Sequence, residues 1–301
     1  MSWPSVSVVI PTKDAGSEFT ELLSRIADQD YPAPVEVVVV DSGSTDGTRD
    51  LAHEHGATVR RIASDEFHHA RTRNYGAECA SNEVVVFTVQ DARPLNERWL
   101  RSLVGALDGD GVGVAYGRQL AYPDAKPMDR FFYEYFYPAE PRTITPDQVS
   151  DSREFYLQNV FVSDVTAAVP REVWSAVRFD PDTPMSEDKE LAIRLLEEGY
   201  SLRYDPTAAV YHSHAYTLDS LFQRRYDDGA AYADIVPDGE RAYISNGLTY
   251  VAAEIRHLLS NGEWEWLPYA IVYDAVHFLG FQLGRRDGRL PQPVKRALGV
   301  V

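Results

Sequence analysis

The chain has 301 residues, of which 44% are hydrophobic and 12% aromatic, so it can build a sizeable core and a disordered chain is excluded. Its formal net charge is −17. An acidic chain repels nucleic acid and anionic lipid, which disfavours a nucleic-acid-binding role. Cys79 is the single cysteine, so no intrachain disulfide can form, which fits a reducing compartment.

We expect no secretory signal in this sequence. Residues 1–4 lead directly into a strand-like run, without the basic region and apolar core of a secretory signal. The apolar stretches near the C-terminus are broken by Asp274, His277 and Gln282, so none has the length of a membrane span. We expect a cytoplasmic protein and leave open a peripheral contact with the inner face of the cell membrane.

Lysine is rare in this chain. It occurs at positions 13, 126, 189 and 295, whereas the other Lys+Arg positions are arginine. A high-salt cytoplasm tolerates an acidic, lysine-poor surface, because counterions screen the repulsion between its charges. A halophilic source is therefore one hypothesis, and an ordinary acidic cytosolic protein is an equal one.

The first third of the chain alternates apolar, β-rich runs with helical patterns. This alternation predicts an α/β fold with a mostly parallel central sheet covered by helices. The expected strands are residues 5–10, 35–40, 57–62 and 83–89, and the expected helices are residues 17–27, 44–55 and 69–80.

Polar side chains follow three of these strands at their carboxyl ends. They are Thr12-Lys13-Asp14, then Asp41-Ser42-Gly43-Ser44, then Gln90-Asp91. Open parallel sheets bind ligands beyond the carboxyl ends of their strands. Loop and capping roles would explain a single residue such as Ser44. The repetition predicts a binding site.

The rest of the chain divides into an irregular middle and a helical end. Residues 117–156 are rich in Tyr, Phe and Pro, which indicates either packing or a substrate cleft. Beyond them we expect a strand at 160–169, a helix at 187–198, an extended segment at 202–210, and helices at 218–232, 239–259 and 266–283. We expect a catalytic domain over residues 1–216 and a C-terminal helical extension over residues 217–301.

Two motifs resemble the opening of the family-2 glycosyltransferases. They are Val8-Val9-Ile10-Pro11-Thr12 and Val39-Val40-Asp41-Ser42-Gly43-Ser44-Thr45-Asp46-Gly47-Thr48. The resemblance implies the GT-A fold, a Rossmann-like nucleotide-sugar-binding sheet. It also implies that the donor is bound by Pro11, Thr12, Asp14 and the Asp41-Ser42-Gly43 turn, with Asp14 and Asp41 on the nucleobase and ribose. A carboxylate accepts hydrogen bonds from such groups.

Three further segments are similar to a rhamnosyltransferase branch of this family. They are Phe87-Thr88-Val89-Gln90-Asp91-Ala92-Arg93-Pro94, Tyr116-Gly117-Arg118-Gln119-Leu120 and Val210-Tyr211-His212-Ser213-His214. In that branch Q-D-A replaces the usual D-x-D. The resemblance implies transfer of L-rhamnose from dTDP-L-rhamnose to a glycan or lipid-linked acceptor. A UDP- or GDP-hexose donor, or a non-catalytic glycan-binding protein on this fold, remains the alternative.

The resemblance also implies a divalent metal at Asp91. A nucleoside diphosphate leaves with concentrated negative charge, which Mg²⁺ or Mn²⁺ neutralises as a Lewis acid. In related enzymes a histidine near this point completes the metal shell, and His214 is preferred over His212. Gln90, which replaces the first acid of D-x-D, offers a carbonyl oxygen to the metal or a bond to a ribose hydroxyl. A helix or turn cap before Arg93-Pro94 is the structural alternative for Asp91.

Glu187-Asp188 begins a predicted helix and matches the family's E-D pair, which implies Asp188 as general base and Glu187 as its orienting partner. Inversion needs a carboxylate on the acceptor side, opposite the leaving phosphate. Acids also favour a helix N-terminus through the helix dipole, which is the structural alternative.

Several basic and amide residues complete the expected site. Relatives place an Arg–Asn pair near the donor in an H-x-x-x-R-N segment, and basic residues against the pyrophosphate. In this sequence these are His69, Arg73 and Asn74, and Arg224 and Arg225, while Arg118 and Gln119 after a predicted strand are candidates for diphosphate or sugar. A guanidinium suits a phosphate. A solvated helix face explains Arg224 and Arg225 equally well.

Two other enzyme classes fit the motifs less well. A nucleotidyltransferase would carry a Gly-rich, basic phosphate loop after the first strand, where this chain has Thr12-Lys13-Asp14-Ala15-Gly16. A dehydrogenase would carry G-x-G-x-x-G there. The sequence does not indicate an oligomeric state.

Overall fold

The computed structural model describes residues 2–149, 154–236 and 240–300, which fall into two units. The first unit comprises Met1–Tyr122, Phe136–Val149 and Phe161–His212, and the second comprises Pro123–Tyr135, Ser150–Val160 and Ser213–Val301. The second unit thus takes two segments from the middle of the chain in addition to its C-terminal part.

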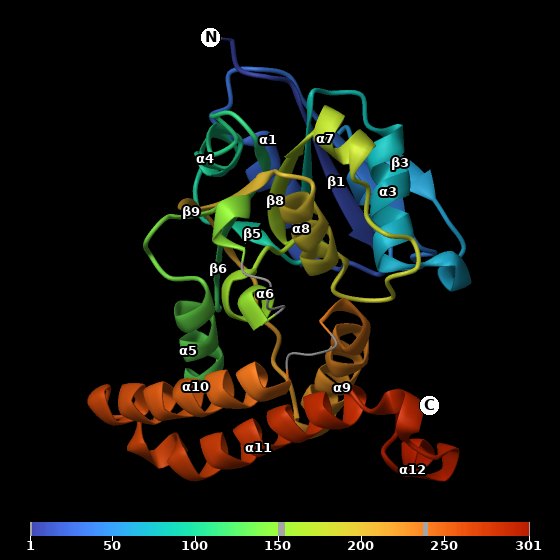
Figure 1. The fold of residues 1–301 in the computed structure, drawn as a ribbon. Helices are drawn as coiled ribbons and strands as arrows, with labels where there is room; N and C mark the ends of the chain where they lie inside the picture. The colour runs from blue at the N-terminus through green and yellow to red at the C-terminus, as the bar shows by residue number, and fades with distance from the viewer. Residues whose placement is uncertain (1, 150–153, 237–239, 301) are drawn as a thin grey trace. The chain divides into compact units, whose positions relative to one another are not determined.

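The first unit is built on one mixed sheet (Figure 1). Its strands are β1 (Val6–Thr12), β2 (Val35–Asp41), β3 (Thr58–Arg61), β4 (Val84–Thr88), β5 (Arg93–Pro94), β6 (Val112–Leu120), β7 (Arg142–Ile144), β8 (Thr166–Pro170) and β9 (Ser201–Tyr211). In the described residues they follow the order β3-β2-β1-β4-β8-β6-β9-β5, with β7 beside β9.

The parallel sheet expected for the first third is confirmed. β1 pairs in parallel with both β2 and β4, and β2 with β3. The strand expected at 160–169 is wrong in its first part: only Thr166–Pro170 forms a strand, β8, which is antiparallel to β4 and β6. The amino end of β8 therefore lies beside the carboxyl end of β4.

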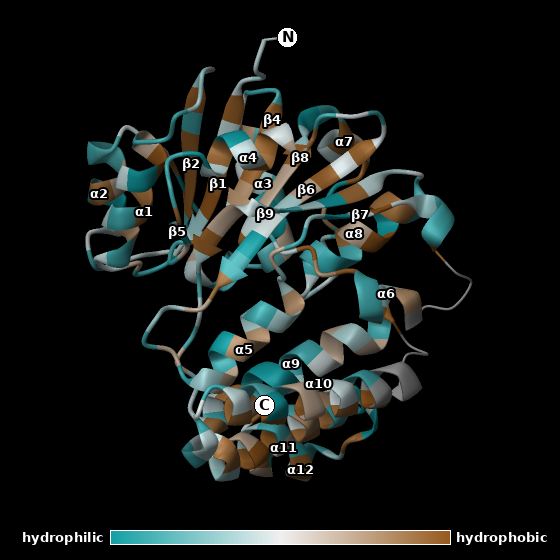
Figure 2. Cartoon of the chain, turned by 90° about the vertical axis from the view of Figure 1, so that its left-hand side faces the viewer, coloured by the Kyte–Doolittle hydropathy of each residue, from teal (hydrophilic) through white to brown (hydrophobic). Residues whose placement is uncertain are grey.

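Apolar strands and amphipathic helices form the core of this unit. Val6, Val8, Val9 and Ile10 of β1 are wholly buried, as expected for a central strand covered on both faces. Figure 2 shows the hydrophobic colour concentrated on β1, β2 and β4. The helices are α1 (Glu18–Ala27), α2 (Thr48–Glu54), α3 (His69–Cys79), α4 (Trp99–Gly105), α7 (Arg171–Ala176) and α8 (Glu187–Glu197), with 3-10 turns η1 (Ser64–Glu66) and η2 (Pro146–Gln148).

A β-bulge interrupts the pairing of β6 with β9. Gly117 pairs with Asp205, whereas Gln119 already pairs with Val210, so β9 takes up the extra residues. A side chain on Gly117 would meet the carbonyl oxygen of Ala208 at 1.9 Å, so only glycine fits here. The bulge re-aims the residues that follow it, among them Gln119.

The second unit is helical in the residues described. It contains α5 (Pro127–Phe136), α6 (Glu154–Asn159), α9 (Leu218–Ile235), α10 (Glu240–Ser260), α11 (Leu267–Gly284) and α12 (Gln292–Ala297), with η3 (Trp264–Trp266) and η4 (Asp287–Arg289). The three long helices expected at 218–232, 239–259 and 266–283 are confirmed over the described residues, and position 239 lies outside them. α9 and α11 pack so closely at Gly284 that a Cβ atom there would lie 1.9 Å from the carbonyl oxygen of Tyr226, so a larger residue would not fit. No helix in the described part of the chain is long and apolar enough to cross a membrane.

Candidate active site

The candidate residues of the first unit gather along one edge of its sheet. Strand register brings Thr12 beside Asp41, Thr88 beside Thr166 and Leu120 beside Tyr211. The carboxyl ends of β1, β2, β4, β6 and β9 therefore meet the amino end of β8. The prediction that the acids after successive strands share one edge is confirmed.

Asp14 and Asp41 hold the two loops expected to bind the nucleoside. The Asp14 carboxylate accepts a 2.7 Å hydrogen bond from the backbone N–H of Thr45, and the Asp14 N–H donates to the Ser44 hydroxyl. Asp41 is wholly buried and accepts from the N–H groups of Gly43 and Ser44. These bonds fix the loop after β2 against the loop after β1. Asp14 remains exposed at their junction.

Gln90 ties the end of β4 to the loop after β1. Its Oε1 accepts from the Lys13 backbone N–H at 2.8 Å, and its Nε2 donates to the Lys13 carbonyl at 3.2 Å. The amide thus pairs with the backbone at both of its ends. A carboxylate could not make the second bond, because it has no donor. This pairing gives a physical reason for glutamine at the first position of the motif.

Asp91 lies beside His212, the histidine that the sequence favoured less. The Asp91 Oδ1 is 3.8 Å from His212 Nε2. On the opposite side of the ring, His212 Nδ1 is 2.9 Å from Gln119 Oε1. The Gln119 oxygen can only accept, so Nδ1 carries the hydrogen and Nε2 presents its lone pair towards Asp91. Metal-binding histidines are oriented in this way by a partner on the second nitrogen.

The remaining basic candidates differ in what they contact. Arg118 Nε donates to the Tyr137 carbonyl at 2.9 Å, so one N–H group of its guanidinium is already engaged within the protein. His214, Arg224 and Arg225 belong to the second unit, and their assigned roles stay predictions. There Arg225 Nη1 lies 2.7 Å from Asp228, which Arg224 also approaches.

Arg73 and Asn74 of α3 are buried supports. Arg73 forms ion pairs with Asp164, just before β8, and at 2.9 Å with Glu187, the first residue of α8. All three side chains are less than a tenth exposed. Asn74 Nδ2 donates to the carbonyl of Phe179 at 2.8 Å. Glu187 is therefore anchored by Arg73, as an orienting residue would be.

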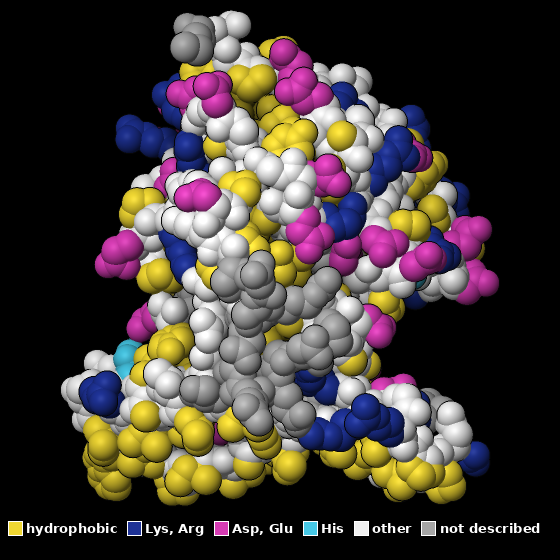
Figure 3. All heavy atoms as spheres, viewed as in Figure 1, with side chains coloured by type: hydrophobic (Ala, Val, Ile, Leu, Met, Phe, Trp, Pro, Cys, Tyr) yellow, Lys and Arg dark blue, Asp and Glu magenta, His cyan; other side chains and the backbone are white. Residues whose placement is uncertain are grey.

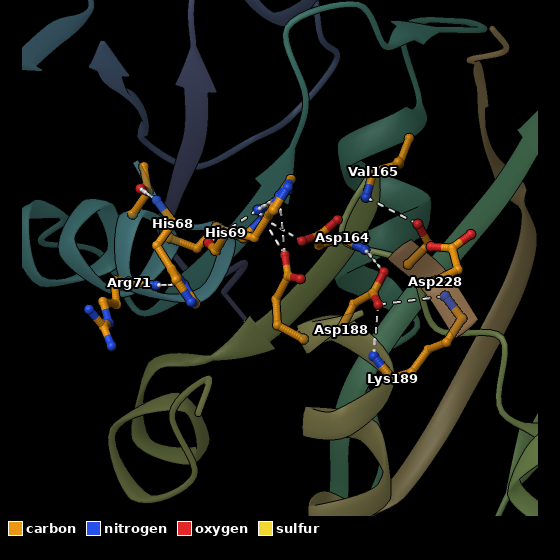
Figure 4. Close-up of polar contacts among 12 residues, drawn as sticks. His68, His69, Arg71, Asp164, Val165, Asp188, Lys189 and Asp228 are labelled. Carbon is orange, nitrogen blue, oxygen red and sulfur yellow. Dashed lines mark hydrogen bonds and ion pairs between the residues drawn. The ribbon is translucent and has the colours of Figure 1, made fainter. Parts of the chain in front are cut away.

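Asp188 faces Asp164 and Lys189 (Figure 4). Its Oδ2 accepts from the Asp164 backbone N–H at 3.4 Å, and its Oδ1 accepts from the Lys189 N–H at 2.8 Å. The Lys189 ammonium lies 3.6 Å from the same Oδ1. The Asp188 side chain is 12% exposed, whereas Glu187 is 5% exposed. Asp188 is thus the more accessible acid of the pair.

Burial raises the pKa of both aspartates. Asp164 and Asp188 border a small internal space that is otherwise lined by apolar side chains, including Phe87, Phe179 and Leu191. Burial raises the pKa of Asp164 to about 6, although Arg73 opposes the shift. Burial also raises the pKa of Asp188, with Lys189 lowering it and Asp164 raising it further. A raised pKa makes a carboxylate a stronger base.

Two residues at the ends of candidate-site elements, Asp14 after β1 and Ser186 before α8, have strained backbones. Asp14 has φ 43° and Ser186 has φ 61°, and they are the non-glycine residues with positive φ in the described part of the chain. Such conformations are uncommon and cluster at functional sites. Ser186 directly precedes Glu187-Asp188, so its conformation sets the direction in which α8 begins.

Sequence reasoning missed Asp164 and the pairing of Gln119 with His212. Asp164 is a single acid within an otherwise apolar run, Val160–Val169, and an acid in such a run was the available signal. Gln119 was a candidate for sugar or diphosphate, but its side chain is 4% exposed and contacts His212.

The family model for glycosyl transferase family 2 matches residues 7–174, which include the loops after β1, β2 and β4 and Asp164, whereas Glu187 and Asp188 lie beyond the match. The chain belongs to glycosyl transferase family 2. A model for glycosyl transferase family group 2 matches residues 147–278. The family assignment makes the chain a nucleotide-sugar glycosyltransferase.

Two relatives from Salmonella are similar over nearly the whole chain. The O-antigen chain rhamnosyltransferase WbaN of Salmonella anatum is 31% identical over 96% of this chain and 91% of its own length. RfbN of Salmonella typhimurium, also an O-antigen chain rhamnosyltransferase, is 31% identical over 95% and 91%. The rhamnosyltransferase-like resemblance of the motifs therefore extends to full-length relatives.

Solved structures support the GT-A fold. A mannosyltransferase from Pyrobaculum calidifontis, in complex with GDP-Man and Mn²⁺, aligns with a TM-score of 0.64 over 94% of this chain and 88% of its own, at 20% identity. TarS residues 1–349 from S. aureus, in complex with UDP, gives a TM-score of 0.57 over 95% and 91%, at 16% identity. The expected α/β GT-A fold with C-terminal helices is confirmed.

Proposed function

We propose that this glycosyltransferase moves L-rhamnose, with inversion, from dTDP-L-rhamnose to a hydroxyl of a glycan or lipid-linked acceptor. The donor sugar is supported by the two rhamnosyltransferases at 31% identity and by the Gln90-Asp91-Ala92 motif. One observation carries the mechanism. The carboxylate of Asp188 has a raised pKa and is partly accessible, and it lies at the same sheet edge as the Asp91–His212 pair.

Asp91 and His212 would hold a divalent cation, and the donor set fits this role. A carboxylate oxygen and an oriented imidazole nitrogen are both suitable ligands, and the imidazole favours Mn²⁺ over Mg²⁺, which prefers oxygen. We keep His214 as a third ligand on the strength of its position two residues beyond His212. When bound, the cation supplies Lewis-acid neutralisation of the leaving diphosphate.

Asp188 acts as the general base in this proposal. Its carboxylate takes the proton of the acceptor hydroxyl as that oxygen attacks the anomeric carbon, and the nucleoside diphosphate leaves from the opposite face. Arg73 holds Glu187, and Glu187 fixes the start of α8, so that Asp188 keeps its direction. Asp14 and the Asp41-Ser42-Gly43 turn hold the nucleoside.

A donor panel tests the proposal. Purified protein is titrated with dTDP-L-rhamnose, a UDP-hexose and a GDP-hexose, with Mn²⁺ and without it, and donor turnover is followed with each. We expect tightest binding of dTDP-L-rhamnose, and loss of its metal-dependent part in Asp91→Asn. Preference for a UDP- or GDP-hexose would reject the rhamnose donor, and metal-independent binding would reject the Asp91 assignment.

The base is tested with Asp188→Asn and the matched control Glu190→Gln, which changes a neighbouring acid of α8 that pairs with Arg194. We expect Asp188→Asn to bind donor normally and to lose about a thousandfold in kcat, within the range for general acid–base catalysis. The control should keep most of its activity. Turnover retained in Asp188→Asn would remove it as the base.

A further inference from the structure

The second unit exposes hydrophobic side chains along α10 and α11. Leu248 and Leu259 of α10 are 69% and 55% exposed, and Ile271 and Leu279 of α11 are 60% and 53% exposed. Figure 3, viewed as in Figure 1, shows hydrophobic side chains gathered along the edge formed by these two helices. A contiguous apolar surface of this kind marks an interaction site.

The apolar residues of α11 form a regular stripe that begins in η3. Trp264, Ile271, Val272, Phe278 and Leu279 are all exposed, and their spacing of seven or eight residues is that of two helical turns. Trp264 is 67% exposed. Pro268 and Ala275, which lie between them on the same side, are also exposed and uncharged. The outward face of α11 therefore carries no charge over this length.

Glu254 of α10 and His277 of α11 are shielded from water, whereas Arg256 of α10 is exposed. Glu254 is wholly buried and accepts a hydrogen bond from Tyr250 at 3.1 Å, and burial together with the nearby Asp274 raises its pKa to about 8. Burial lowers the pKa of His277 well below its usual value, which favours the neutral ring. A helix on water normally shows the reverse pattern, with apolar residues inside. This reversal fits helices whose outer face meets an apolar phase.

A basic segment follows the apolar stripe directly. Between residues 285 and 296 the chain carries Arg285, Arg286, Arg289, Lys295 and Arg296, with Asp287 as the acid among them. Arg289 and Arg296 are exposed. This local excess of positive charge contrasts with a net charge of −17 for the whole chain. Apolar helices bordered by basic residues bind anionic membrane surfaces, and an exposed tryptophan favours the interface.

We propose that α10 and α11 lie in the plane of an anionic lipid bilayer surface, with their apolar stripes at the headgroup–acyl boundary and the 285–296 segment on the headgroups. Charge complementarity selects this occupant over a second copy of the chain. This membrane proposal does not depend on the donor sugar or on the metal. The membrane proposal and the proposed function can therefore be rejected independently of each other.

Vesicle binding by the full chain tests this surface. Purified protein is sedimented with phosphatidylcholine vesicles and with vesicles that also contain phosphatidylglycerol. We expect binding to the anionic vesicles, weakened by salt. Ile271→Asp with Leu279→Asp should reduce binding about tenfold or more, because charged groups would enter the apolar boundary. Arg289→Glu with Arg296→Glu should reduce only the anionic preference.

The matched control is Leu95→Asp, which changes a leucine of the first unit that is 38% exposed. This variant should bind vesicles like the wild type, and donor binding should be unchanged in all variants. Trp264 gives a readout that does not depend on folding of an aspartate variant: its emission, isolated by comparison with Trp264→Phe, should shift to the blue on vesicle addition.

Three results would overturn the proposal. The first is no binding of the wild type to anionic vesicles, or no shift of Trp264 emission. The second is equal binding by the wild type and the Ile271→Asp, Leu279→Asp variant, or equal binding to neutral and anionic vesicles. The third is a wild-type dimer in sedimentation that this variant converts to monomer without any vesicle binding, which would assign the face to a second copy.

Discussion

Gln119 holds His212 so that Nε2 of its ring faces Asp91. The Gln119 Oε1 lies 2.9 Å from His212 Nδ1, and His212 Nε2 lies 3.8 Å from Asp91 Oδ1. The bulge after Gly117 makes this possible, because it sets the register at which Gln119 meets the end of β9. A backbone irregularity where β6 pairs with β9 is thereby linked to the direction of an imidazole.

Gln119→Leu is expected to lower the affinity for Mn²⁺ about 10- to 100-fold, the usual effect of losing the partner that orients a metal-binding histidine. The measurement is calorimetric titration of Mn²⁺ in the presence of a nucleoside diphosphate. Gln119→Glu keeps an acceptor for the Nδ1 hydrogen and should retain most of the affinity. Equal affinities of wild type and Gln119→Leu would show that Gln119 serves packing alone.

Lys189→Met is expected to move the acid limb of kcat/KM to higher pH. The Lys189 ammonium is 3.6 Å from Asp188 and lowers its pKa, so removing it lets burial raise that pKa further. The base is active only when deprotonated, so activity should then require a higher pH. Lys189→Arg keeps the charge and should keep the profile. If the acid limb does not move, the ionisation that limits kcat/KM at low pH is not that of Asp188.

Arg73→Met should destabilise the protein by about 3–5 kcal/mol, because it leaves the buried carboxylates of Asp164 and Glu187 without their cation. The matched control is Arg71→Met on the same helix. Arg71 pairs with Asp182, but its side chain is 59% exposed, so we expect a loss below about 1 kcal/mol. Urea unfolding of both variants measures the difference. Similar losses in both would contradict the buried network.

Asp164→Asn should flatten the dependence of stability on pH. The pKa of Asp164 is about 6 in the folded protein, above its unfolded value, so the folded state binds its proton more tightly. Its contribution is complete below the unfolded pKa and is lost as pH rises through about 6. The shift corresponds to about 3 kcal/mol. Unfolding free energies at acidic and neutral pH should change less in the variant than in the wild type, and an identical change would refute the raised pKa.

Local patterns in the sequence predicted much of the fold. The apolar run of β1 and the stripe of Phe19, Leu22 and Ile26 in α1 are both buried as their periodicity requires. The direction of β8 was not predictable, because the alternation of buried side chains is the same in parallel and antiparallel strands. The sequence therefore indicated the elements better than their pairing.

The candidate site was predictable where its residues follow strands or form a motif. This rule selected Asp14, Asp41 and Asp91 as candidates, and the resemblance to the family's E-D pair selected Asp188. Arg73 was expected near the donor, and the structure places it between Asp164 and Glu187. These residues come from α3, the start of β8 and the start of α8, so their meeting depends on packing between distant segments. The contact of Gln119 with His212 was not predictable for the same reason, because it also joins distant segments of the chain.

The left-handed backbone conformation of Ser186 affects which substitutions would be accepted when variants of this enzyme are screened for stability or for activity. Glycine adopts such a conformation without strain, and a strained residue of this kind costs about 1 kcal/mol or more. Ser186→Gly is thus a route to heat tolerance that removes no more than one buried hydroxymethyl group. It would also loosen the backbone at the residue that sets the direction of α8 and thereby of Asp188. A laboratory screen for thermal resistance alone is expected to accept this change, and a screen for turnover is expected to reject it.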